Sequence, residues 1–301
     1  MINYKTIFVI VVSVIFTACK DNSSNQMNVK RYDFDLQGHR GARGILPENS
    51  LKGFQKAIDL GVSTLELDVV ISKDSLVVVS HEAYMNPKIC LDPKGNKITD
   101  KSDFNLFEMT YDEIKAFDCG SLKHPDFPDQ KPQPTFKPLL SEVINLTSQN
   151  LIQRGKLVGL NIELKSNQET DGIYHPKPED FVDLVMNTIK NGLISIDKIT
   201  IQSFDERVLR YCIENYPMIE VAYLVEDDNL NDNLKKLGKT PQIYSPMYTL
   251  VDSLTVNQAR KAGIKVIPWT VNEVKDMHNL LELGVDGLIT DYPNKAKTFI
   301  K

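Results

Sequence analysis

Short apolar runs alternate along the chain with longer stretches in which apolar residues recur every three or four positions. Runs rich in Val and Ile that end at polar or turn residues are typical of buried strands, whereas the longer periodicity predicts amphipathic helices. Strands that alternate with helices favour a parallel sheet covered by helices. The strand candidates cover 34–38, 63–72, 76–82, 158–165, 198–204, 220–225, 242–246, 265–271 and 286–290. The clearest helical patterns cover 48–61, 178–193, 205–217 and 272–285.

The nine strand candidates are one more than an eight-stranded barrel needs. Only the segment 73–75 separates the second candidate from the third, whereas parallel neighbours need a crossover of about a dozen residues or more. These two are therefore expected to form an antiparallel hairpin that places His81 roughly opposite Leu67, beside Glu66 and Asp68. The other eight strands predict an α/β fold, a (β/α)8 TIM barrel.

One irregular region, from about 82 to 138, interrupts the alternation of strands and helices. It is rich in Pro, Lys and Asp, and its one helical pattern lies near 110–117. Long insertions in barrels usually carry functional lids. We expect a barrel over 35–301 with this inserted segment over its C-terminal mouth.

The N-terminus has the pattern of an export signal. Its apolar run at 7–16 follows a lysine and is too short for a comfortable membrane span, so 1–18 predicts a signal peptide. The small residues before Cys19 resemble the bacterial lipoprotein cleavage box. That resemblance implies cleavage there, lipid on the Cys19 sulfur and a membrane-anchored lipoprotein of the cell envelope, with 19–34 as a polar tether. An ordinary secretory signal or a short anchor helix remains the alternative.

Charge and cysteine content narrow the class of protein further. The net charge of −5 lacks the basic footprint of a nucleic-acid-binding protein, so no nucleic acid is expected as a partner. Export makes a disulfide possible, and Cys90 and Cys119 flank the same irregular segment. A bridge between these two, or buried free thiols, are the two interpretations, and Cys212 lies in a helical pattern. No cysteine spacing suggests a zinc site.

Three carboxylates are expected to converge at the barrel mouth, where the active sites of such barrels form. Glu66 and Asp68 are two residues apart on one strand and point to one face, and Glu163 lies on the next parallel strand. Three carboxylates in a partly buried site cannot remain unpaired. A hard divalent cation, Ca²⁺ or Mg²⁺, would satisfy them, because both ions take oxygen ligands.

The stretch GHRGARGILPENS (38–50) has the features of a catalytic loop at a strand-to-helix junction. Its glycines let the backbone pass close to a ligand, and Ser50 or Asn49 can cap the following helix. His39 offers proton transfer, and Arg40 offers anion binding.

A set of short motifs follows one another along the chain. They are HRG at 39–41, PENS at 47–50, ELDV at 66–69, VVSHE at 78–82, IELK at 162–165, QSF at 202–204, WTVN at 269–272 and DGLITDYP at 286–293. Taken in order, these motifs resemble the glycerophosphodiester phosphodiesterase family, whose members are TIM barrels of the phospholipase C-like type. The resemblance spans about 36–298. Glu82 is one departure, because the family usually has Asp after the second histidine, and little effect is expected from it.

The resemblance implies a reaction and roles for the polar residues. Glu66, Asp68 and Glu163 would hold one divalent cation, Ca²⁺ or Mg²⁺. His39 and His81 would be the acid/base pair of a metal-dependent hydrolysis that converts glycerophosphodiesters to glycerol 3-phosphate and an alcohol.

Three further residues would bind the small-molecule substrate. Arg40 and Lys165 would neutralise phosphate oxygens, Arg40 with two parallel hydrogen bonds and Lys165 as a point charge. Trp269 would pack against glycerol or the alcohol, unless it is a core tryptophan at a strand end. The favoured route is attack of the glycerol 2-hydroxyl on phosphorus, followed by hydrolysis of the cyclic phosphate.

Other functions remain open from the sequence. The expected lipid anchor would place the site near membranes, which keeps a lysophospholipid phosphodiesterase as an alternative. A phosphodiesterase acting on phosphoinositol is disfavoured by the HRG motif and the inserted segment, and a glycosidase by the histidine pair and Lys165. From another class, a lipid-anchored barrel that binds a phosphate ligand without catalysis is the last alternative. A barrel that has lost catalysis would be expected to lack a metal ligand or a histidine of the site. This chain has all three carboxylates and both histidines.

Overall fold

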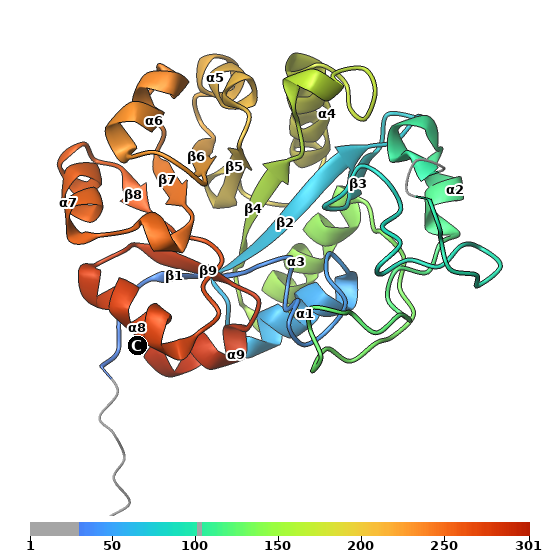
Figure 1. The fold of residues 1–301 in the computed structure, drawn as a ribbon, viewed down its shortest axis with the longest axis horizontal. Helices are drawn as coiled ribbons and strands as arrows, with labels where there is room; N and C mark the ends of the chain where they lie inside the picture. Colours follow the sequence, from blue (N-terminus) through green and yellow to red (C-terminus); the bar gives the residue numbers. More distant parts are fainter. Residues whose placement is uncertain (1–29, 101–103) are drawn as a thin grey trace, which may run out of the picture. The chain divides into compact units, whose positions relative to one another are not determined.

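Eight parallel strands lie side by side with helices around them (Figure 1). Most residues of these strands are buried, as expected where both faces of a sheet are covered. In sheet order the strands are β9 (Gly287–Thr290), β1 (Asp35–Gly38), β2 (Thr64–Ile71), β4 (Gly159–Leu164), β5 (Ile199–Ser203), β6 (Glu220–Val225), β7 (Ile243–Pro246) and β8 (Lys265–Val266). The last strand of the sequence, β9, thus pairs with the first, β1, and the expected (β/α)8 barrel is confirmed.

The strand expected at 265–271 is regular only over its first two residues, the β8 pair. Pro268 has no N–H to donate to a neighbouring strand, which breaks the regular ladder. Single backbone hydrogen bonds close the barrel instead: the Asp286 N–H donates to Val266 O at 2.9 Å and the Ile289 N–H to Pro268 O at 3.0 Å.

Helices follow each parallel strand and bury their apolar faces against the barrel. The helices outside the inserted region are α1 (Leu51–Leu60), α3 (Leu140–Arg154), α4 (Pro178–Lys190), α5 (Glu206–Asn215), α6 (Leu230–Leu237), α7 (Ser253–Lys261), α8 (Val274–Leu283) and α9 (Pro293–Ala296). The four helices predicted from the clearest patterns are confirmed as α1, α4, α5 and α8.

The predicted hairpin is present. β3 (Val77–Val79) pairs antiparallel with β2, with Val79 opposite Val69. The Ser80 N–H continues the ladder by donating to Asp68 O at 3.0 Å. Regular pairing ends before His81, so the expected pairing of His81 with Leu67 is not formed as part of the strand. The chain bends at His81, and the histidine lines the cavity at the barrel mouth together with Glu66.

Between β3 and α3 the chain builds a second, smaller apolar cluster beside the barrel, which includes Met85, Leu106 and Ile114. The helical pattern at 110–117 forms α2 (Tyr111–Lys115). Cys90 and Cys119 form a disulfide in this cluster, which decides between the two interpretations that the sequence left open. Cys212 is a buried free thiol in α5. The limits of the insertion, about 82 and 138, stay a prediction.

This computed structural model describes residues 30–100 and 104–301. The expected signal peptide, Cys19 and most of the expected tether lie outside the described residues. Arg31–Lys301 form one compact unit. Within the described ranges, no helix combines the length and apolar character needed to cross a membrane.

Candidate active site

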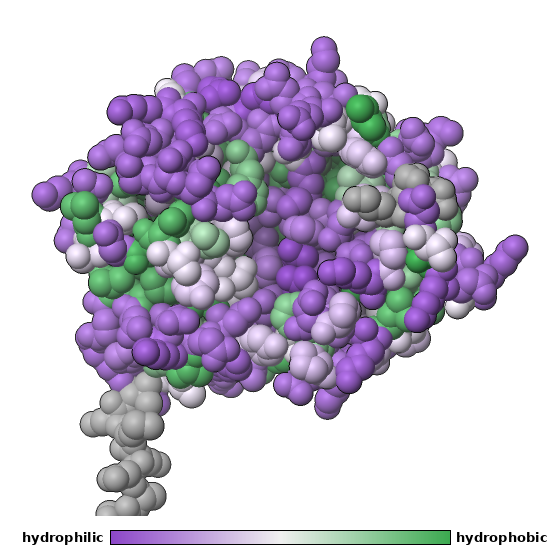
Figure 2. All heavy atoms as spheres, in the orientation of Figure 1, coloured by the Kyte–Doolittle hydropathy of each residue, from purple (hydrophilic) through white to green (hydrophobic). Residues whose placement is uncertain are grey.

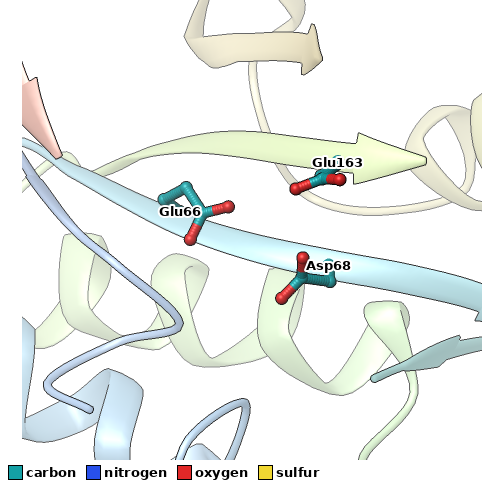
Figure 3. Close-up of side chains that lie close together, drawn as sticks. All are labelled: Glu66, Asp68 and Glu163. Atoms are coloured by element: carbon teal, nitrogen blue, oxygen red, sulfur yellow. The ribbon is translucent and has the colours of Figure 1, made fainter. Parts of the chain in front are cut away.

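The three predicted carboxylates meet at the mouth of the barrel. Glu66 and Asp68 project from β2 and Glu163 from β4, with their carboxylate groups turned toward one another (Figure 3). One oxygen from each lies within 4.8 Å of the others, and all three residues are buried. The i and i+2 spacing on β2 and the alignment of Asp68 with Glu163 in the parallel ladder produce this arrangement.

The electrostatics of this carboxylate triad are unfavourable without a cation. Burial, together with the charges of Asp68 and Glu163, raises the pKa of Glu66 well above its ordinary value. Burial also raises the pKa of Glu163. Burial acts in the same direction on Asp68, but the neighbouring cations Arg40 and Lys165 outweigh it and lower the pKa of that carboxyl.

Hydrogen bonds fix each carboxylate in place. Glu66 accepts from the Arg40 backbone N–H at one oxygen and from the Gln202 amide at the other, both at 2.8 Å. Asp68 Oδ2 accepts from the Asn49 amide at 2.8 Å, whereas Asp68 Oδ1 is buried and accepts no hydrogen bond from the residues that the structure describes. The carboxylate oxygens that could bind a metal ion are therefore held around a shared centre, where Asp68 Oδ1 lies without a hydrogen bond from the described residues.

Lys165 places a positive charge beside two of the three carboxylates. Its ammonium group donates to Glu163 Oε1 at 2.6 Å and lies 3.7 Å from Asp68 Oδ1. Lys165, expected to neutralise phosphate oxygens, therefore lies directly beside the carboxylate triad.

His39 lies at the end of β1, and a carboxylate holds its ring. Asp291 Oδ1 is 2.7 Å from His39 Nδ1, and Asn272 donates to the other Asp291 oxygen at 2.7 Å. His39 Nε2 then faces the triad, 4.0 Å from Glu66 Oε2. Burial lowers the pKa of His39, an effect that the charge of Asp291 opposes.

His81 follows the hairpin strand and is held in a similar way. Its Nδ1 lies 3.0 Å from Glu82 Oε1, and within the described part of the chain no carboxylate forms an ion pair with Nε2. The buried Lys137 donates to Ser80 Oγ at 2.8 Å, and Ser80 in turn donates to the Glu82 carbonyl. The two histidines therefore each have one ring nitrogen bound to a carboxylate and the other available to a ligand.

A cavity of about 380 Å³, the central cavity, joins these groups. Figure 2 shows it as a hollow lined by hydrophilic residues over β2 and β4. Both histidines, Glu66, Glu163 and Lys165 line it. Trp269 lines the opposite wall, where its ring meets Phe204 edge to face at 5.4 Å and its N–H donates to Ser245 O at 2.8 Å.

Arg40 also lines the central cavity, but its guanidinium is engaged by protein carboxylates. Arg40 Nη1 donates to Glu48 at 3.0 Å, and Nε lies 3.3 Å from Asp68 Oδ2. The two parallel hydrogen bonds expected from Arg40 to a phosphate would therefore compete with Asp68 for Nε.

The loop that carries His39 and Arg40 depends on unusual backbone angles. Arg40 (φ 49°) and Asn49 (φ 50°) lie in the left-handed region, which turns the Arg40 N–H toward Glu66 and the Asn49 amide toward Asp68. Gly41 (φ 89°) packs so closely on the first turn of α1 that a Cβ there would lie 2.8 Å from Gly53 C. Ser50, one of the two predicted caps, accepts from the Gly53 N–H at 3.0 Å.

The structure adds residues that the sequence did not single out. Asp291, Glu48, Arg43 and Lys137 surround the predicted groups. Asp291 and Glu48 stand in the DGLITDYP and PENS motifs, so a signal was present in the sequence. Arg43 lies in the loop at 38–50 that the sequence singled out, but no role was assigned to it. Lys137 had no signal, because only the packing of the inserted segment brings it to the mouth.

Comparisons with known proteins point to one family. The family model described as the glycerophosphoryl diester phosphodiesterase family matches residues 39–295. A glycerophosphodiester phosphodiesterase of Bacillus altitudinis is 31% identical, covering 86% of this chain and 94% of that protein. The mouse lysophospholipase D GDPD1 is 27% identical over 87% of this chain and 84% of its own.

A solved structure has the same fold. It is a Silicibacter pomeroyi protein provisionally named a glycerophosphoryl diester phosphodiesterase, and it superposes with a TM-score of 0.79. It is 29% identical and covers 90% of this chain and 95% of its own. With the family model matched along nearly the whole barrel, this chain belongs to the glycerophosphoryl diester phosphodiesterase family.

Proposed function

We propose that this chain hydrolyses glycerophosphodiesters to glycerol 3-phosphate and an alcohol, with one divalent cation held by Glu66, Asp68 and Glu163. The observation that carries the proposal is the pairing of this triad with two histidines, each held at Nδ1 by a carboxylate, around one cavity. Family membership and the names of the relatives support the same reaction.

The residues present fit a hard cation. All three donors are carboxylates, the class of ligand that Ca²⁺ and Mg²⁺ prefer. In the described ranges no hydrogen bond reaches the buried Asp68 Oδ1, and the pKa of Glu66 is raised by burial and by its two carboxylate neighbours. A bound cation would supply Lewis acidity to a phosphate oxygen. Either ion is compatible with this donor set.

The first step needs a base near the attacking oxygen. We propose that the glycerol 2-hydroxyl attacks phosphorus, that one of His39 and His81 takes its proton at Nε2, and that the other protonates the departing alcohol oxygen. The P–O bond to glycerol forms as the P–O bond to the alcohol breaks. Lys165 and the available donors of Arg40 would offset the charge on the phosphate oxygens.

The second step is hydrolysis of the cyclic phosphate. Water attacks phosphorus and gives its proton to the histidine that donated one, while the other histidine returns a proton to the 2-hydroxyl. The products are glycerol 3-phosphate and the free alcohol, and both histidines regain their starting states.

Substitution of the named groups tests these roles. His39→Gln and His81→Gln should each lower kcat by about 10²–10⁴-fold, the usual contribution of a general acid or base. Glu163→Gln should lower activity and weaken activation by the cation. His278→Gln is the matched control, because His278 is exposed on α8. Unchanged kcat in both active-site histidine variants would contradict the proposed roles.

A lysophospholipid is a second candidate substrate. The central cavity adjoins a hollow of about 310 Å³ lined in part by Ala83, Leu164 and Phe204, which share apolar surface suited to an acyl chain. The name of the mouse relative supports this reading. The ratio of kcat/KM for glycerophosphocholine to that for lysophosphatidylcholine decides between the two substrates.

Membrane anchoring is a further part of the proposal. We propose export by the signal at 1–18 and attachment through lipid on Cys19, with 19–34 as tether. The Cys90–Cys119 disulfide supports export, because such bonds persist in oxidising compartments. Cys19→Ser should abolish labelling by palmitate and move the chain out of the membrane fraction. Retention of both label and membrane association in Cys19→Ser would contradict it.

A further inference from the structure

The central cavity has a second arginine beside His39 with no role assigned so far. Arg43 lines it from the loop after β1, whereas Lys165 lines it from the end of β4, with the triad strand β2 between them. Positive groups therefore stand on both sides of the carboxylate triad. A phosphate in the central cavity would lie between them.

The guanidinium of Arg43 keeps donors available for a ligand. Its Nε lies 2.7 Å from Glu48 Oε2, which fixes one edge of the group. Among the residues that the structure describes, neither Nη donates a hydrogen bond, and 18% of the side chain is exposed. Arg40 differs, since Nη1 and Nε both meet carboxylates and the side chain is 9% exposed.

The inserted segment holds Arg43 in this position. The Arg43 guanidinium lies 4.6 Å from the ring centre of Phe127, and the Gln130 amide donates to the Arg43 carbonyl at 2.7 Å. His124 lies 4.8 Å from Phe127, ring centre to ring centre, and 3.7 Å from Glu48. Phe127, Gln130 and His124 are buried. Stacking on an aromatic ring restricts the guanidinium and lowers the entropy lost when it binds an anion.

We propose that Arg43 is a second phosphate-binding arginine of this site, and that Phe127 of the inserted segment holds it in place. The ligand class is a phosphate monoester or diester, and the inference rests on the proposed function. The inserted segment thus contributes to the phosphate site itself as well as standing beside the mouth.

Titration of inorganic phosphate into the full-length chain, with Mg²⁺ present, tests this without turnover. Arg43→Gln should raise the Kd for phosphate about tenfold or more, because a charged hydrogen-bonding pair is lost. Arg154→Gln is the matched control, since Arg154 is an exposed arginine paired with Asp59 on the surface. Unchanged Kd in Arg43→Gln, or no phosphate binding by the wild type, would overturn the proposal.

A merely structural role for Arg43 gives a different result. If Arg43 only balances the buried Glu48, then Arg43→Gln lowers Tm and leaves the phosphate Kd unchanged. Should Arg43→Gln fail to fold, Arg43→Lys keeps the charge beside Glu48 but offers a single donor group. That variant should raise Kd several-fold, and an unchanged Kd would overturn the proposal equally.

The contribution of Phe127 is measured by a double-mutant cycle. Phe127→Leu should raise the phosphate Kd, and combining it with Arg43→Gln should add little more. Phe136→Leu is the control, because that ring lies under Lys115 in the same segment. Additive effects would overturn the part assigned to Phe127. A wild type that binds phosphate but releases no glycerol 3-phosphate contradicts the proposed function instead, and the Arg43→Gln titration still decides this inference.

Discussion

At the scale of single residues, the site depends on carboxylates that orient histidines as much as on the histidines themselves. Asp291 binds His39 Nδ1 and is itself held by Asn272, so the ring cannot turn its Nε2 away from the triad without losing that bond. Glu82 does the same for His81. Glu82 keeps the hydrogen bond to His81 Nδ1 in this chain, although the family usually has the shorter Asp at this position.

Asp291→Asn should lower kcat by about tenfold or more, because the ring of His39 loses its orienting partner. The carboxylate also raises the pKa of His39 against the effect of burial. Its removal therefore lowers that pKa, and the limb of the pH–rate profile set by His39 should move to lower pH. Profiles of kcat/KM for wild type and variant measure both effects.

Asp112→Asn is the control for that experiment, because Asp112 is exposed on α2. An Asp291→Asn profile that lies at the same pH as the wild type would contradict the account of His39.

Site residues that lie at a fixed spacing on a strand, or directly after one, were predictable from the sequence. Glu66, Asp68 and Glu163 follow from strand spacing, and His39 and His81 from their places at strand ends. Arg43 lies in the predicted catalytic loop, but the sequence assigned it no role, since an arginine between two small residues in a loop has many roles. Only its packing on Phe127, more than eighty residues away, distinguishes it.

At the scale of elements, the loop between β1 and α1 controls the geometry of the mouth. It carries His39 and Arg40, supplies Asn49 to Asp68 and caps α1 with Ser50. Gly41 allows the loop to pass directly over the start of α1. Few substitutions at that position are compatible with both the positive φ and the close approach.

Gly41→Ala should destabilise the fold and lower activity. The positive φ costs about 1–2 kcal/mol for a residue with a Cβ, and overlap with the Gly53 backbone adds about 1–3 kcal/mol. Gly61→Ala is matched to it, because Gly61 (φ 103°) has open space where a Cβ would lie and incurs only the first cost. Urea unfolding of both variants measures the difference, and equal losses would contradict the steric argument.

The disulfide should stabilise the inserted segment. Cys90 and Cys119 are 29 residues apart, and closing a loop of that size stabilises a fold by about 2–4 kcal/mol. Reductant should therefore lower the Tm of the wild type and leave that of the double variant Cys90→Ser, Cys119→Ser unchanged. A wild-type Tm that does not respond to reductant would contradict this prediction.

Elements were predictable where one local rule dominates. The short link at 73–75 required a hairpin, and the hairpin register followed from it. The strand at 265–271 was overextended, because its apolar run continues past Pro268 while its regular hydrogen bonding stops earlier. The path of the insertion was not predictable, since it is set by a disulfide and by a small apolar cluster of its own.

At the scale of the whole molecule, the barrel concentrates charge at one end. The strand order brings β1, β2 and β4 side by side. It thereby gathers His39, the carboxylate triad and Lys165 at the ends of these strands. Periodicity in the sequence predicted this architecture, because eight strand-helix units have few other ways to bury their apolar faces. It could not predict the side-chain network at the mouth, which combines residues from distant loops.

Cation binding should stabilise the whole fold, because the ion binds the folded triad and offsets its repulsion. At a concentration one hundred times Kd, Ca²⁺ or Mg²⁺ should contribute about 2.7 kcal/mol and raise Tm. Asp68→Asn should reduce the rise. Thermal denaturation with each ion and with chelator measures it. Equal Tm values in all conditions would contradict a cation site at the triad.

The most direct test of the central claim is release of glycerol 3-phosphate by purified protein lacking residues 1–19. The substrates are glycerophosphocholine and glycerophosphoethanolamine, each with Ca²⁺, with Mg²⁺ and with chelator. The account predicts release that requires the cation and is lost in His39→Ala and Glu66→Ala. A folded protein that releases no glycerol 3-phosphate from either substrate under any of these conditions would contradict it.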